Sequence, residues 1–223
     1  MLFDLDGATL IARSIVLIIA FTVHEFAHAW TANHFGDDTP RINGRLTLNP
    51  LAHLDPLGSL LLLVVGFGWA KPVPVNPYLL RRRSSAALMW VSLAGPASNL
   101  LLAILAAIPF RLGLVSASQA YQDAFLNTTF RWLPSLPQIL IDFVFINLLL
   151  MLFNLIPLSP LDGDKVFDYF LPPPLAKVWE MIRPYGPLIL MAVVFIGPSL
   201  LKIDILGKII YPPLFFLLSL LIG

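Results

Sequence analysis

The chain has 223 residues, of which 58% are hydrophobic and 12% are charged, and its formal net charge is +1. Ordinary soluble domains carry roughly twice that charged share, so too little polar surface exists to cover a water-soluble globule, and lipid must face much of the chain. The near-zero net charge gives no reason to expect a nucleic-acid partner. The absence of cysteine excludes disulfides, thiolate metal sites and cysteine nucleophiles.

Five hydrophobic stretches are predicted to be membrane helices, which indicates a mainly α-helical, polytopic membrane protein. The first three run from Thr9 to Phe35, from Ser85 to Ile108 and from Pro137 to Ile156. The last two, Pro187 to Leu201 and Ile205 to Ile222, resemble a helical hairpin, and each is near the lower limit of roughly 17 residues for crossing a bilayer. We therefore expect one membrane-embedded domain over 1–223, with a core over 9–170 and a C-terminal helical hairpin over 187–222.

The segment between the first two helices is expected to form a small strand-bearing re-entrant loop. As a helix, Leu57 to Phe67 would cover roughly 16 Å, about half of the hydrocarbon thickness, so it is either a re-entrant piece or a sixth span. Arg41 to Leu48 alternates like a strand, and the prolines of Lys71 to Val75 restrict that stretch to a sheet edge. Because non-helical backbone at membrane depth needs protein or water around it, this loop is predicted to adjoin an active-site chamber.

The distribution of Lys and Arg predicts the orientation of the helices. Most of these residues lie in the segments that follow the first and the third predicted helix. The excess of positive charge in cytoplasmic loops therefore puts these segments inside and the N-terminus outside. We expect an integral protein of the plasma membrane with its active site toward the cytoplasmic side.

The sequence His24-Glu25-Phe26-Ala27-His28 lies inside the first predicted helix. Positions i and i+4 share one helical face, so both imidazoles can reach one metal ion, and Glu25 beside them can take a proton from a water held there. Zinc suits two imidazoles and a carboxylate, with a fourth position left for that water. Ionisable side chains inside a membrane segment cost a few kcal/mol each and are usually functional, which favours a metal site over merely hydrogen-bonded core histidines.

The third predicted helix is expected to deliver the third ligand at the same depth. It leads into Asn154-Leu-Ile-Pro-Leu-Ser-Pro-Leu-Asp162-Gly163, where Pro157 and Pro160 break the helix. Asp162 is the predicted ligand, and Asp164 stays open as its rival. Two independent segments thus predict one Zn²⁺ ion held by two histidines and an aspartate.

These motifs, together with NPLAHLDPLG, GWAKPVPVNP and AGPASN, resemble those of the site-2 protease family of intramembrane zinc metalloproteases, in its compact form without a PDZ domain. The resemblance covers about His24 to Gly163. It implies zinc ligation by His24, His28 and Asp162 and catalysis by Glu25 as the base. It also implies substrate contacts from Asn154 and, in the Gly-Pro-x-x-Asn element, Asn99.

The expected function is that of a zinc-dependent endopeptidase of the HExxH type, which hydrolyses transmembrane or membrane-proximal segments of a protein substrate by metal-activated water. Two alternatives stay open. A membrane metal-ion carrier would pass ions along the histidines and the aspartate, but it would not need Glu25 beside the metal. A catalytically inactive family member would only bind membrane helices, and the intact His24, Glu25, His28 and Asp162 argue against it.

Overall fold

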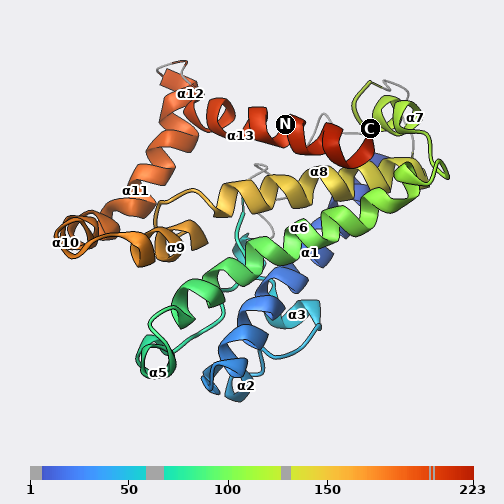
Figure 1. The fold of residues 1–223 in the computed structure, drawn as a ribbon. Helices are drawn as coiled ribbons and strands as arrows, with labels where there is room; N and C mark the ends of the chain where they lie inside the picture. The colour runs from blue at the N-terminus through green and yellow to red at the C-terminus, as the bar shows by residue number, and fades with distance from the viewer. Residues whose placement is uncertain (1–6, 59–67, 127–131, 201, 203) are drawn as a thin grey trace.

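The structure, a computed structural model, describes residues 7–58, 68–126, 132–200, 202 and 204–223 (Figure 1). Five helical runs in this part of the chain are long and apolar enough to cross a membrane. They are α1 (Gly7–His34), α6 (Ala87–Arg111), α8 (Leu136–Asn154), the composite run Pro173–Ser199, and α13 (Ile205–Ile222). The expected mainly α-helical, polytopic class is confirmed.

Small residues line the buried face of α1. Ala8, Ala12, Val16 and Ala20 recur at every fourth position, and all four are fully buried. Side chains at this spacing lie on one face of a helix, and small side chains allow close approach between helices where lipid offers no hydrophobic driving force. This stripe explains why α1 packs against both α6 and α8.

The C-terminal helix α13 packs on the same bundle through an apolar stripe of its own. Ile210, Leu214 and Leu218 belong to one buried cluster with residues of α6 and α8. At the far end of α6, Nε of Arg111 donates to the carbonyl of Leu221 at 2.8 Å. The C-terminal ends of α6 and α13 therefore lie together, and α13 runs along α8 in the opposite direction (Figure 1).

The chain between α8 and α13 consequently starts and finishes at the same end of the bundle. It holds α9 (Asp162–Phe170), α10 (Pro173–Ile182), η3 (Arg183–Tyr185), α11 (Gly186–Met191), η4 (Ala192–Ile196) and α12 (Gly197–Leu200). Figure 1 shows α11 and α12 leading to the start of α13 instead of running beside α8. α13 packs on α6 and α8 because its apolar stripe finds partners there, and the helical hairpin expected over 187–222 stays a prediction.

Single cysteines in this cysteine-free chain test the topology that follows. We expect Ser118→Cys, in α7 (Ala117–Tyr121) between α6 and α8, and Gly223→Cys to react with an impermeant maleimide from the same side of a vesicle, because α6 and α13 end together. Tyr78→Cys, in α5 (Pro77–Arg83) before α6, is expected to react from the opposite side. Labelling of Gly223→Cys together with Tyr78→Cys would contradict this arrangement and indicate a further crossing.

The expected strand over Arg41 to Leu48 is wrong. The short helix α2 (Thr39–Ile42) takes the start of this stretch, with Pro40 in its first turn, where a fixed φ favours a helix. Gly44 then turns the chain with φ of 68°, a conformation that glycine adopts without steric cost. Local turn signals thus outweigh an alternation that spans only a few residues.

The expected edge strand over Lys71 to Val75 is neither helix nor strand, although its prolines favour an extended backbone. Its prolines cannot donate to a ladder, and the nearest pairing is an isolated bridge between Leu54 and Ala70. The backbone N–H of Lys71 donates to His53 O at 2.7 Å, which fixes the start of this stretch. The other part of the expected loop, Leu57 to Phe67, lies outside the described residues from position 59 onward.

Candidate metal centre

His24 and His28 continue the interior stripe of α1, because they follow Ala20 at the same four-residue spacing and are buried like it. Nδ1 of His28 donates to the carbonyl of Val91 on α6 at 2.7 Å. A Cβ atom at Gly95 would lie 2.5 Å from Nε2 of both histidines. Only glycine therefore lets α6 pass this close to the two rings.

A chain of buried amides holds His24 in one orientation. Nδ2 of Asn147 donates to the carbonyl of Phe143 at 2.9 Å, so Oδ1 of Asn147 must accept. It accepts from Nδ2 of Asn99 at 2.9 Å, which turns Oδ1 of Asn99 toward Nδ1 of His24 at 2.6 Å. Because an amide oxygen only accepts, Nδ1 of His24 carries the proton and Nε2 keeps its lone pair.

This arrangement gives Asn99 a different place from the expected substrate contact. Asn99 is fully buried behind His24, and it is not among the described residues that line the adjacent cavity. Its oxygen and its nitrogen are both engaged, by His24 and by Asn147. Its position is therefore that of a residue that orients an imidazole.

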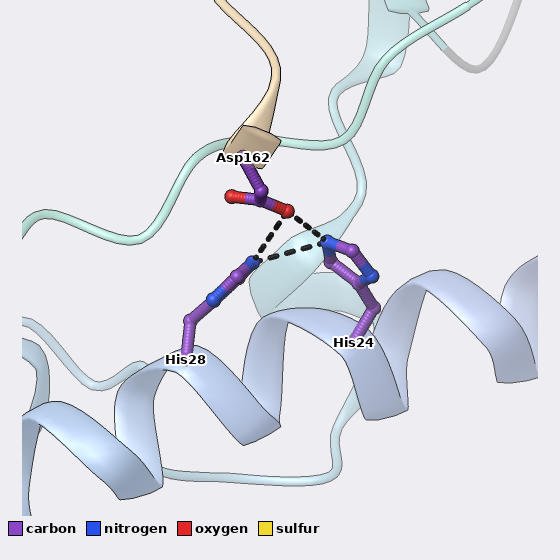
Figure 2. Close-up of side chains that lie close together, drawn as sticks. All are labelled: His24, His28 and Asp162. Carbon is purple, nitrogen blue, oxygen red and sulfur yellow. Dashed lines mark hydrogen bonds and ion pairs between the residues drawn. The ribbon is translucent and has the colours of Figure 1, made fainter. Parts of the chain in front are cut away.

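Asp162 reaches the histidines from the start of α9. A Cβ atom on Gly163 would collide with the carbonyls of Leu155 and Ile156, so glycine at this position lets α9 begin against the end of α8. Oδ2 of Asp162 lies 3.1 Å from Nε2 of His24 and 3.3 Å from Nε2 of His28 (Figure 2). The two Nε2 atoms lie 3.0 Å apart, so three ligand atoms from two distant segments meet in one small triangle.

The triangle fits a zinc ion. Atoms bound at about 2.1 Å to a tetrahedral zinc lie about 3.4 Å from one another, and the separations of 3.0, 3.1 and 3.3 Å found here are slightly shorter. With Nδ1 of each imidazole already donating, three lone-pair-bearing atoms face one another. Such atoms repel unless a cation lies between them, and two imidazoles with one carboxylate form a common set for a catalytic zinc site.

The charge state of Asp162 agrees with a role as ligand. Burial alone raises the pKa of this carboxyl. When the imidazoles are protonated, however, attraction to His28 and hydrogen bonds from both rings outweigh burial and hold the pKa well below its ordinary value. A cation inside the triangle acts in the same direction. Asp162 is therefore ionised at neutral pH.

Asp164, the rival ligand, lies outside the triangle. Its carboxylate is buried and accepts from Nε1 of Trp179 at 2.7 Å and from Nε of Arg183 at 3.0 Å. Arg183 also pairs with Asp168 at 3.0 Å. The second aspartate of the motif therefore ties α9 to the following helices, while the first faces the histidines.

Glu25 and Asn154 line a cavity of about 430 Å³ that opens beside the three ligand atoms. Oε2 of Glu25 accepts from the backbone N–H of Val73 at 3.2 Å, which joins the Lys71 to Val75 stretch to the site. Nδ2 of Asn154 donates to Leu150 O at 3.0 Å within its own helix, so the amide oxygen of Asn154 takes no part in this hydrogen bond. The remaining walls are mostly apolar.

Comparison with curated proteins finds several bacterial relatives. The chain is 44% identical to "Putative zinc metalloprotease YwhC" of Bacillus subtilis (strain 168) over 184 residues, which cover 82% of this chain and 80% of that protein. It is 30% and 29% identical to the proteins named "Putative zinc metalloprotease Rip2" of Mycolicibacterium smegmatis and Mycobacterium tuberculosis (strain H37Rv), over 82% of this chain and 66% of each relative. No family model matches the sequence, and no solved structure matches it.

Proposed function

The chain belongs to the site-2 protease family of zinc metalloproteases, and from this membership we propose that it is an intramembrane endopeptidase whose hydrolytic centre is formed by His24, His28, Asp162 and Glu25. The observation that carries the proposal is the meeting of the three ligand atoms at the edge of a cavity that Glu25 also lines. The whole span 1–223 acts as one membrane-embedded domain in this proposal.

Metal binding and proton transfer are assigned to different residues in this proposal. His24, His28 and Asp162 would hold the zinc ion, which supplies a polarised carbonyl and a water acidic enough to lose its proton near neutral pH. Glu25 would accept a proton from the attacking water and return it to the leaving amine nitrogen, as a group that serves first as general base and then as general acid. Its Oε2 is engaged by Val73 N–H, which fixes the carboxylate while Oε1 has no partner among the described residues.

The Lys71 to Val75 stretch beside the site suits an unwound substrate. A membrane-spanning helix hides its amides in its own hydrogen bonds, so the segment to be cut must lose its helical structure first. Lys71 to Val75 is not helical and puts Pro72, Val73 and Val75 in the cavity wall, and its prolines favour an extended backbone. An unwound segment can donate its backbone N–H groups to the carbonyls of this stretch, which favours a transmembrane or membrane-proximal protein substrate.

The orientation proposed for the molecule follows its basic residues. Arg81, Arg82 and Arg83 end α5, at the end of the bundle where α6 begins. Positive residues near the ends of spans favour the cytoplasm. We therefore place this end, near which α1 and α9 supply the candidate zinc ligands, toward the cytoplasmic side.

Removal of the metal tests the proposal. Full-length protein in liposomes, mixed with a membrane-spanning model substrate, is expected to cleave it while holding about one zinc per chain, as a site with three protein ligands requires. A chelator should abolish cleavage and added Zn²⁺ should restore it, with fragments identified by mass spectrometry. Zinc uptake into the vesicles without cleavage would instead support a metal-ion carrier. The absence of both cleavage and zinc uptake would support a protein that only binds membrane helices.

A further inference from the structure

Lys165 puts a positive charge into an otherwise mostly apolar cavity. Among the described residues that line the cavity, it is the one Lys or Arg. It follows Asp162 by three positions on α9, so the two side chains share a face of that helix. Lys165 is half-buried and therefore lies in the wall of the same chamber as the zinc ligands and Glu25.

The carboxylates around Lys165 already have partners. On its own helix, Asp162 faces the histidines, while Asp164 and Asp168 both pair with Arg183. Across the cavity, Glu25 accepts from Val73 N–H. Lys165 itself makes no hydrogen bond or ion pair with any residue in the described part of the chain. A purely structural ion pair therefore does not account for it.

A half-buried lysine without a partner beside a mostly apolar cavity is costly where its charge loses contact with water, and such groups usually meet an anion. The cavity supplies apolar walls for neighbouring side chains, among them Phe21, Leu150 and Phe153. We propose, on the basis of the protease function above, that Lys165 binds a carboxylate of the peptide in the cavity. The carboxylate belongs either to an Asp or Glu beside the scissile bond or to the C-terminus released by cleavage.

Charge reversal at Lys165 provides the test. Three model substrates carry Glu, Gln or Lys at the positions that flank the mapped scissile bond, and kcat/KM is measured with full-length protein in liposomes. If Lys165 binds an acidic side chain of the substrate, we expect the wild type to prefer Glu over Lys by about tenfold or more, since hydrogen bonds between charged groups are stronger than neutral ones. Lys165→Glu should reverse the order. Lys177→Glu, the same change at an exposed position of α10, should leave it unaltered.

For a released C-terminus, the expected pattern is different. The three substrates are then cut at the same rate. The N-terminal product, which carries the new C-terminal carboxylate, inhibits the wild type more strongly than the same fragment with an amidated C-terminus. In Lys165→Met the two fragments inhibit equally. Zinc content is measured in every variant so that a damaged metal site is recognised. If wild type cleaves but Lys165 variants change neither substrate ranking nor fragment inhibition, the inference fails while the protease function stands. If wild type cleaves no substrate, the protease function itself fails.

Discussion

Replacement of Glu25 by glutamine is expected to lower peptide cleavage by about 10²–10⁴-fold while leaving the zinc content unchanged. Glutamine keeps the size of the side chain and an oxygen for Val73 N–H, but it cannot accept a proton from water. A general base contributes about 10²–10⁴-fold to the rate, so kcat/KM should fall by about that factor. The measurement pairs cleavage of a membrane-spanning substrate with elemental analysis of the purified protein.

A matched control is available on α10, where Glu180 is exposed and makes no contact with the cavity. Glu180→Gln makes the same chemical change away from the site and should leave cleavage at the wild-type rate. Equal cleavage by wild type and Glu25→Gln would remove Glu25 from the mechanism. Loss of zinc from Glu25→Gln would mean that this carboxylate belongs to the metal site instead.

The sequence predicted the long helices well because each depends on local properties. α1, α8 and α13 begin and end within a few residues of the expected Thr9 to Phe35, Pro137 to Ile156 and Ile205 to Ile222. Hydropathy and flanking polar or helix-breaking residues are enough to locate such spans. The path of the chain is not a local property. Composition marked Pro187 to Leu201 as apolar but could not tell that the following helix would pack along α6 and α8.

The candidate metal centre was predictable for the same local reason, and its supporting residues were not. The spacing of His24 and His28 puts both imidazoles on one helical face before any tertiary structure is known. The positions of Gly95 and Asn147 matter only once α6 crosses α1 and α8. A buried amide in the middle of α8 was a usable signal for Asn147, because intramembrane amides commonly hydrogen bond between helices.

The supporting residues explain why a polar network persists inside an apolar bundle. The path from Phe143 O through Asn147 and Asn99 to His24 has one direction only, because a backbone carbonyl fixes its far end. Partners of this kind set the tautomer of a ligand histidine and strengthen it as a metal ligand. The amides therefore determine which nitrogen of His24 is free, although neither of them lines the cavity.

Exchange of Asp162 for alanine is expected to remove zinc, whereas Asp164→Asn should retain it. Asp162 supplies the one carboxylate oxygen of the triangle, and its loss leaves two imidazoles to hold the ion. Loss of a supporting residue alone costs 10–100-fold in metal affinity, so loss of a ligand should lower zinc affinity by more than about 100-fold. Competition with a chromophoric chelator measures the affinity, and cleavage should disappear with the metal.

Asp164→Asn serves as the comparison because it tests the structural role of Asp164, which joins α9 to the following helices. Asparagine can still accept from Trp179 but no longer forms an ion pair with Arg183, whose remaining partner is Asp168. We expect a lower Tm with about one zinc per chain, since breaking a mostly buried pair destabilises the fold. Zinc loss from Asp164→Asn together with full zinc binding by Asp162→Ala would exchange the two assignments. The hydrolytic mechanism could then no longer depend on a zinc site formed by His24, His28 and Asp162.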